Sequence, residues 1–365
     1  MLKTMRSNYY AIKSHLDPQQ VSFLIFYVTN RCNFRCNFCF YHEEIAKGKK
    51  DDELSVEEIK RIAQKAGPII QLSLTGGEPF LRTEIKEIAS IFITHNHVKY
   101  LTIPTNGSLP LRIVEFVEDT VARYEQTNFR IVFSIDGIGE DHDRYRSTPG
   151  SYKKIQESYQ LVSPLRKKYP NLVLDSNSVF SAGNENRILD IVQTIDKDFD
   201  FDNISVTYIR GGAKDPSLKK TSFEKYLKLN EFLEGLHRKK EKRFLYPVWR
   251  AVRDISREYL IATEMKDQFV TSCVAGRKLI VIREAGEVQP CEILSKTFGN
   301  IRNYDYDLQR MVADTANKEI CDWIIRTKCK CTFECALAAN VIWSRPNYFK
   351  LIAKTIRNIG QPAHA

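Results

Sequence analysis

Three cysteines share one short loop near the start of the chain, at Cys32, Cys36 and Cys39. The apolar segment 21–28 predicts a β-strand, so the thiols follow the end of a strand. Three thiolates in a C-x3-C-x2-C spacing can hold three irons of a cubane iron–sulfur cluster. The fourth iron keeps an open position, which a metal site needs in order to bind a substrate. A zinc site would need a fourth ligand, for which only His42 is nearby, so we favour the cluster.

Six more cysteines gather in a second group, and all of them lie within residues 271–340. They are Cys273, Cys291, Cys321, Cys329, Cys331 and Cys335. Residues 1–20 lack the apolar core of a signal peptide, so we expect a cytoplasmic protein. A reducing compartment disfavours disulfides, and tight cysteine spacing then indicates metal ligation. A β-hairpin that turns at residues 284–286 would carry Cys273 and Cys291 to one site.

Strand-like and helix-like segments alternate before this second group. Strands are expected near 21–28, 69–74, 99–104, 129–135, 171–180 and 203–209. Amphipathic helices are expected near 55–66, 83–94, 110–124, 151–168 and 184–196. This alternation predicts an α/β fold, a parallel sheet wrapped into a partial (β/α)6 TIM-like barrel. In such barrels, functional residues gather at the carboxyl ends of the strands.

The pattern changes after the barrel. We expect the partial barrel over 1–215, a charged helical linker over 216–270 and a smaller cysteine-bearing domain over 271–340. One helix with Pro346 in its first turn, followed by a tail, is expected over 341–365. The net charge is +10, but the basic residues are dispersed, which disfavours nucleic-acid binding. The basic, amphipathic C-terminal helix either packs on its own domain, which we favour, or lies on a membrane surface.

The cysteine loop resembles that of the radical S-adenosylmethionine (SAM) superfamily. Segments resembling further motifs of this family follow in order, at 75–79, 104–107, 134–137 and 142–146. The resemblance implies that a [4Fe-4S] cluster held by Cys32, Cys36 and Cys39 cleaves bound SAM reductively. The resulting 5′-deoxyadenosyl radical would abstract hydrogen from a substrate carbon. An electron donor such as flavodoxin or ferredoxin is then needed.

The resemblance also implies which residues bind the cofactors. They are Phe38, Gly76, Gly77, Glu78, Pro79, Asn106, Ser134, Asp136 and Arg146. The Gly-Gly-Glu run would line the site of the methionine amino group, and Ser134 would contact the ribose. Arg146 would bind the SAM carboxylate, since a guanidinium forms a fork that suits a carboxylate; Arg144 is the competing choice. Ser147 stands where the family prefers Gly, which leaves the geometry of the next turn open.

The second group resembles the SPASM and twitch domains that append auxiliary clusters to radical SAM barrels. Cys273, Gly286 and Cys291 match the opening C-x12-G-x4-C spacing. No clean C-x2-C-x5-C run is present and no cysteine follows Cys335, so one auxiliary [4Fe-4S] cluster is implied. The implied metal ligands are Cys273, Cys291, Cys329, Cys331 and Cys335, with Cys329 the rival of the other four. Cys321 is the spare thiol, either packed beside Trp323 or acting as a hydrogen-atom donor.

Arg210 ends the sixth predicted strand, where its cation would either hold a carboxylate or phosphate of the substrate or form an internal salt bridge. We place it with the three loop cysteines among the catalytic residues. The leading hypothesis is a radical SAM oxidoreductase that oxidises a small polar substrate. The alternative enzyme matures a peptide or protein by crosslinking, oxidation or epimerisation. The non-enzyme alternative is an iron–sulfur electron carrier, against which the SAM-binding motifs argue.

Overall fold

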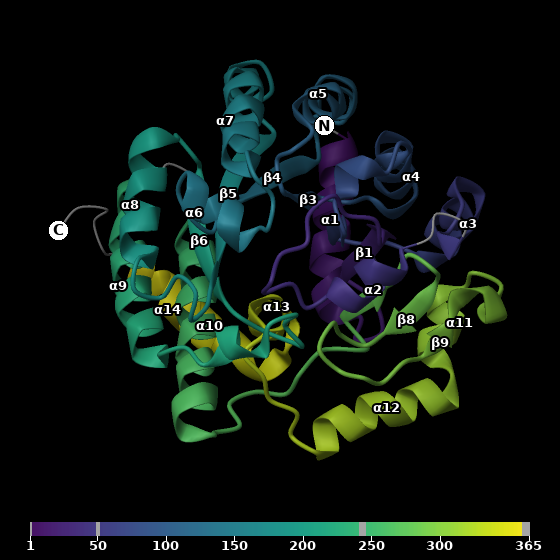
Figure 1. The fold of residues 1–365 in the computed structure, drawn as a ribbon. Helices are drawn as coiled ribbons and strands as arrows, with labels where there is room; N and C mark the ends of the chain where they lie inside the picture. Colours follow the sequence, from purple (N-terminus) through teal and green to yellow (C-terminus); the bar gives the residue numbers. More distant parts are fainter. Residues whose placement is uncertain (1, 49–51, 241–245, 360–365) are drawn as a thin grey trace.

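A computed structural model describes residues 2–48, 52–240 and 246–359. Its first part is a row of parallel strands with helices outside it (Figure 1). The strands are β1 (Phe23–Thr29), β2 (Gln71–Gly76), β3 (Tyr100–Thr105), β4 (Asn128–Ser134), β5 (Leu172–Phe180) and β6 (Asn203–Tyr208). The main helices between them are α3 (Val56–Ala66), α4 (Ile85–Asn96), α5 (Pro110–Phe116), α7 (Ser151–Val162) and α8 (Ile188–Asp198). The expected α/β partial barrel is confirmed, and each predicted strand lies within two residues of the observed one.

The barrel is held by side chains that alternate along each strand. Leu72 and Leu74 of β2 and Leu101 and Ile103 of β3 are fully buried under the outer helices. The entry to α3 follows from local chemistry, since Ser55 and Glu58 form a capping box in which each side chain accepts from the other's backbone N–H. These interactions fix the strand ends, and with them the loops that carry the site.

The sheet does not end with the barrel. Its strand order is β6-β5-β4-β3-β2-β1-β7-β8-β9, with β7 (Leu279–Ile282), β8 (Glu287–Gln289) and β9 (Gly299–Asn300) added beyond β1. Strand β7 pairs in parallel with β1, and β7 and β8 form the expected hairpin. The cysteine-bearing region therefore extends the barrel sheet directly.

The remaining helices are α9 (Phe223–Lys240), α10 (Tyr246–Lys266), α11 (Leu308–Ala313), α12 (Thr315–Arg326), α13 (Glu334–Trp343) and α14 (Tyr348–Ile359). Of these, α9, α10 and α14 lie on the side of β6, and α11 and α12 lie beside β8 and β9 (Figure 1). The expectation of one helix from residue 341 onward is wrong: α13 ends at Trp343, and Pro346 lies in a separate 3-10 turn before α14. Proline lacks the N–H that a continuing helix would use, so the chain turns there.

An N-terminal helix, α1 (Leu2–Leu16), lies at the start of the sheet. Lys278, which precedes β7, donates from Nζ to the Ser14 carbonyl at 2.7 Å. The Tyr10 ring stacks on His97, which precedes β3, at 4.6 Å between centroids. Helix α1 thus covers the amino ends of the strands, opposite the loops described below. Of the helices that the structure describes, none is long and apolar enough to cross a membrane.

Candidate active site

The loop after β1 presents the first three cysteines at the carboxyl end of the sheet. Burial, together with the charges that Cys36 and Cys39 would carry as thiolates, raises the pKa of Cys32 to about 12. Burial also raises the pKa of Cys36 to about 11, although the Arg146 guanidinium acts in the opposite direction. Coordination by iron would stabilise the thiolate forms, because a metal ion favours the deprotonated ligand. These thiols lie close enough to influence one another, as ligands of one cluster should.

The two glycines after β2 are explained by contact with this loop. The Gly77 N–H donates to the Thr29 carbonyl at 2.8 Å, and the Glu78 N–H donates to the Arg31 carbonyl at 2.9 Å. A Cβ added at Gly76 would clash with the Thr29 carbonyl oxygen, and one added at Gly77 with the Arg31 carbonyl oxygen. Glycine is thus required here for the backbone of the β2 loop to lie against the cysteine loop.

Glu78 ties the same loop to the end of β3. Its buried carboxylate accepts from the Asn106 N–H at 2.7 Å, from Thr105 Oγ1 at 2.8 Å and from the Phe80 N–H at 3.1 Å. Burial raises the pKa of Glu78 to about 7 despite these bonds. Asn106 in turn donates from Nδ2 to Asn33 Oδ1 within the cysteine loop at 2.9 Å. Pro79 begins the short 3-10 turn that follows Glu78.

Arg146 faces the cysteine loop, and Arg144 does not. Two nitrogens of Arg146 lie 2.6 Å from Asp136 Oδ2, and its Nη1 lies 3.9 Å from Cys36 Sγ. Its guanidinium also lies over the Phe38 ring, 5.3 Å from the centroid. Arg144 is exposed and pairs with Asp141. Arg146 is therefore the one of the two that the fold brings to the predicted cofactor site.

Asp136 and the turn after Arg146 hold this arginine in place. Asp136 is buried, and its second oxygen accepts from the Val179 N–H at 2.6 Å. Ser147, which replaces the glycine of the family, adopts a left-handed φ of 51°, the backbone region in which glycine is favoured. A serine thus adopts a left-handed backbone conformation at this turn. Ser134 is half-buried at the end of β4, beside Asn177 of β5.

Glu53 is a buried acid that the sequence analysis did not single out, and it binds residues at the start of the cysteine loop. The Glu53 carboxylate accepts from Arg31 Nε at 2.9 Å and from Arg82 Nη1 at 2.6 Å, and it also accepts from the Thr29 hydroxyl. Thr29 and Arg31 precede Glu53 by more than twenty residues and Arg82 follows it by 29, so no spacing rule could have joined them. The acidic run before α3 was the only available signal.

Five of the C-terminal cysteines belong to one hydrophobic cluster, in which Cys273 and Cys291 are buried and Cys329, Cys331 and Cys335 pack against them. Burial, together with the charges that Cys273, Cys291 and Cys329 would carry as thiolates, raises the pKa of Cys331 to about 12. Burial also raises the pKa of Cys335 to about 11, with Arg210 acting in the opposite direction. The five expected ligands therefore lie in the same region of the fold.

Cys321 lies apart from these thiols. Its Sγ is 3.4 Å from the Gly276 carbonyl, and the side chain is buried in the core of the cysteine-bearing region. A Cβ at Gly276, whose φ is 81°, would meet Cys321 Sγ at 2.7 Å. The position fits a packed thiol, in line with the simpler of its two expected roles.

No three His, Cys, Asp or Glu side chains among residues 2–48, 52–240 and 246–359 are arranged to hold a metal ion. A zinc ion would require ligands that converge on one point at about 2.0–2.3 Å. A cubane cluster distributes its ligands over separate irons, so its thiolates need not converge in this way.

Arg210 forms the internal salt bridge that was one of its two expected roles. Its Nη2 lies 3.1 Å from Glu292 Oε2, and Tyr27 donates from its hydroxyl to Glu292 at 2.7 Å. Its guanidinium also lies over the rings of Phe40 and Phe333, at 5.2 and 4.5 Å from the centroids. The sequence missed Glu292 as the partner, although it directly follows Cys291.

A cavity of about 470 Å³ opens beside this salt bridge. The end of β6, helix α10 and the Lys330–Thr332 segment line it. Its lining carries Arg210, Lys219 and Lys330 together with Glu264 and Asp267. Lys330 pairs with Asp267, and Arg210 with Glu292, so two of the three cations are already neutralised. The cavity is polar without a concentrated charge of either sign.

The radical SAM superfamily model matches residues 26–175, which span β1 to β5 and every residue of the Cys32–Cys39 loop. The chain contains a radical SAM domain. That family implies SAM and a [4Fe-4S] cluster as cofactors, and the donor set found here fits both. Cys32, Cys36 and Cys39 would hold the cluster, and the ends of β2, β3 and β4 would surround SAM.

Curated relatives match about half to three fifths of the chain. GTP 3′,8-cyclase of Alkaliphilus oremlandii is 30% identical over 190 residues, 51% of this chain and 56% of the relative. A cysteine-type anaerobic sulfatase-maturating enzyme of Clostridium novyi is 26% identical over 243 residues, 60% of this chain and 62% of the relative. The chain spans little more than half the length of these relatives.

Solved structures match over more of the chain. SuiB of Streptococcus suis bound to S-adenosylmethionine has a TM-score of 0.57 at 17% identity, covering 85% of this chain and 69% of that one. Native anSMEcpe with bound AdoMet has a TM-score of 0.57 at 18% identity, covering 93% of this chain and 98% of that one. At these identities the likeness is one of fold, and it extends beyond the radical SAM domain into the C-terminal region.

Proposed function

We propose that this radical SAM enzyme oxidises a side chain of a peptide or protein, with one auxiliary cluster in its C-terminal domain. The cavity at the barrel mouth carries the proposal. It is polar, and its cations are largely paired with acids of the same region. A peptide segment can bind through polar contacts in a cavity without a large net charge. A nucleoside triphosphate instead needs unpaired basic groups for its phosphates. The sulfatase-maturating relative from Clostridium novyi, by its name, acts on a protein.

Residues at different places in the site would have different roles. When bound, SAM and its cluster would supply the radical that removes a substrate hydrogen, and an auxiliary cluster would accept the second electron of an oxidation. Cys32, Cys36 and Cys39 hold the first cluster, and Asp136 aims Arg146 at the same region. Arg210, fixed by Glu292 and two aromatic rings, borders the cavity and positions the substrate. A flavodoxin-like or ferredoxin-like donor would reduce the first cluster, and the auxiliary cluster would pass the substrate's electron on.

We assign the auxiliary cluster to Cys273, Cys291, Cys329 and Cys331. This choice is supported by the packing of these thiols in one hydrophobic cluster and by the charges of the other three acting on Cys331. Cys335, expected among the main ligands, packs against the same cluster beside Arg210 and is the rival of Cys329 for the fourth position. On this assignment residues 1–215 form the barrel, 216–270 the linker and 271–340 the auxiliary domain.

A second candidate function is the oxidation of a small polar molecule. Its supporting observation is the cavity volume of about 470 Å³, which lies within the ordinary range for small-molecule sites. The match to GTP 3′,8-cyclases also favours a small substrate. An electron carrier is disfavoured, because such a protein has no use for residues arranged around SAM.

An anaerobic incubation separates these functions. Reconstituted protein is mixed with SAM, dithionite and either a pool of peptides or a pool of sugars and nucleosides, and the products are followed by mass spectrometry. We expect 5′-deoxyadenosine in both and loss of two hydrogens only from a peptide. Oxidation of a small alcohol alone would overturn the peptide proposal. The Cys32→Ala, Cys36→Ala and Cys39→Ala triple variant is the control and should form no 5′-deoxyadenosine.

A further inference from the structure

Helix α14 is attached to the molecule by its polar face. Lys350 and Lys354 both pair with Glu258 of α10, each at 2.9 Å. Asn358 is buried one turn further on and donates to the Pro247 carbonyl at 3.3 Å. An amphipathic surface helix normally turns its apolar side toward the core. Here the polar side faces inward, so the apolar side is left outside.

The outer side of α14 is a continuous apolar stripe. Phe349, Ile352, Ile356 and Ile359 recur at helical spacing and are between 59% and 85% exposed. Exposing large apolar side chains to water is unfavourable, because burying their apolar surface would lower the free energy. A stripe of this kind typically marks a contact with a partner or a membrane.

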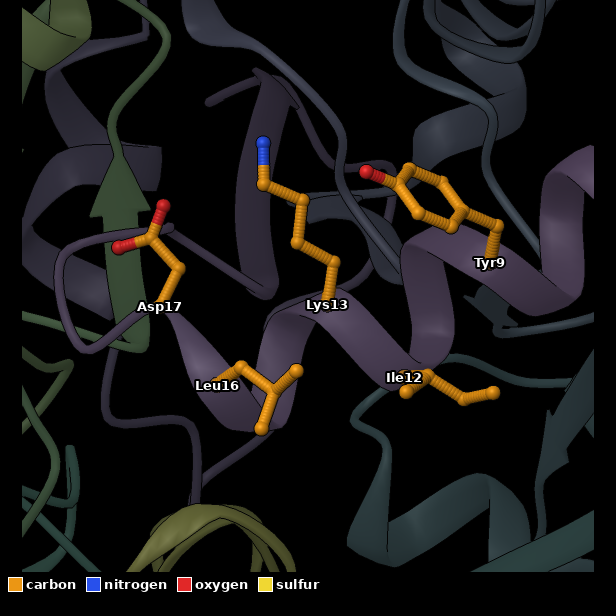
Figure 2. Close-up of a pocket in the computed structure, with 5 residues that line it drawn as sticks. All are labelled: Tyr9, Ile12, Lys13, Leu16 and Asp17. Atoms are coloured by element: carbon orange, nitrogen blue, oxygen red, sulfur yellow. The ribbon is translucent and has the colours of Figure 1, made fainter.

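Helix α1 carries a second stripe of the same kind. Tyr9, Ile12 and Leu16 are between 60% and 70% exposed, again at helical spacing. Figure 2 shows these side chains projecting from α1, together with Lys13 and Asp17, which line the same pocket. They line a pocket of about 390 Å³ on the surface of the molecule.

The two stripes belong to neighbouring elements. His15 Nδ1 of α1 lies 3.0 Å from the Tyr348 hydroxyl at the start of α14. Arg345 also donates to the Leu16 carbonyl at 3.4 Å. We call the seven exposed apolar residues of α1 and α14 the terminal apolar face. This face lies toward the amino ends of the strands, away from the cysteine loop and its cavity.

Bases outnumber acids in the sequence around the terminal apolar face. Helix α1 carries Lys13 and no Asp or Glu, and Asp17, which follows the helix, lines the same pocket. From residue 335 onward the chain carries Arg345, Lys350, Lys354 and Arg357, again without an acid. A basic apolar surface complements an anionic lipid headgroup layer, which attracts Lys and Arg and accommodates apolar side chains beneath it.

We propose that the terminal apolar face docks the enzyme on the surface of an anionic membrane. Its stripes would insert into the boundary between headgroups and acyl chains, while Lys13 and Arg357 would contact lipid phosphates. A second copy of this chain is a poorer occupant, because a two-fold contact would place the same bases against one another. Docked in this way, the barrel mouth faces the aqueous phase and stays open to a soluble substrate.

Vesicle sedimentation tests the proposal with full-length, cluster-loaded protein. The probes are vesicles of phosphatidylcholine with and without phosphatidylglycerol. The test variant carries Phe349→Ser, Ile352→Ser and Ile356→Ser. The matched control carries Leu111→Ser, Leu161→Ser and Leu189→Ser, three exposed leucines on helices α5, α7 and α8. Both variants remove exposed apolar groups, so neither should unfold the protein.

We expect the parent and the control to bind the anionic vesicles and to bind neutral ones much more weakly. The test variant should lose at least about a hundredfold in partitioning, since each inserted Phe or Ile contributes about tenfold. Three results would overturn the proposal. They are no binding of the parent to anionic vesicles, equal loss in both variants, and a parent dimer in light scattering that the test variant converts to monomer.

Discussion

Replacing Gly77 with alanine should damage the active site through backbone contact alone. A Cβ at Gly77 would lie well under 3.0 Å from the Arg31 carbonyl oxygen, and ordinary contact begins at 3.4 Å. Backbone atoms cannot rotate away, so the β2 loop and the cysteine loop must separate by about 1 Å, a shift that costs a catalytic site about a hundredfold in rate.

The stability cost has two parts. Overpacking costs about 1–3 kcal/mol. Loss of the bonds from the Gly77 and Glu78 N–H groups to the Thr29 and Arg31 carbonyls costs about 0.5–1.5 kcal/mol each. We therefore expect Gly77→Ala to lower the free energy of unfolding by about 2–6 kcal/mol. 5′-Deoxyadenosine formation should fall by about a hundredfold.

Denaturant unfolding and a timed 5′-deoxyadenosine assay measure the two effects. The matched control is Gly212→Ala, also near the barrel mouth, where an added Cβ meets nothing within 4 Å and φ is not positive. It should keep both stability and SAM cleavage. If Gly77→Ala matched the parent in both measurements, contact between the two loops would not be what requires glycine.

Three further variants test the other parts of the site. Asp136→Asn should leave the buried Arg146 without its counter-charge, destabilise the fold by about 3–5 kcal/mol in denaturant unfolding and slow SAM cleavage; full stability would refute the pairing. Cys331→Ala should remove about four irons per chain and Cys321→Ala none, measured by iron analysis; the reverse would overturn the ligand assignment. Burial lowers the pKa of Lys278 from 10.5 to about 8 in the folded protein. Between these two pH values, the Lys278 side chain therefore binds a proton in the unfolded chain but not in the folded protein. The parent should therefore gain stability over Lys278→Met as pH rises through that window, and a flat difference in unfolding free energy would contradict it.

Local patterns predicted the barrel well. The strand expected at 129–135 is observed at Asn128–Ser134, because its apolar residues alternate and turn residues follow it. The cysteine loop and the Gly-Gly-Glu run were equally visible, since each motif is contiguous. Both depend on interactions within a few residues, which sequence spacing reports directly.

Features that join distant segments were not predictable. Strand β7 has four residues, and its parallel pairing with β1 depends on the completed fold. Which four cysteines would bind one cluster depends on how α12 and α13 place their loops, so sequence spacing could not choose between Cys329 and Cys335. Periodicity showed that α14 is amphipathic, but it could not show which side faces α10. The expectation that this helix packs on its own protein was correct, with the polar side inward.

The pairing of β7 with β1 has a consequence for any attempt to express the radical SAM domain alone. Cutting the chain before β7 would leave the Phe23–Thr29 strand with an uncovered row of backbone N–H and C=O groups. That strand is buried along its whole length and carries no charge, so nothing in it would discourage pairing with another chain. Such a fragment should form aggregates joined through β1, whereas fragments that retain residues up to the β7–β8 hairpin should remain dispersed.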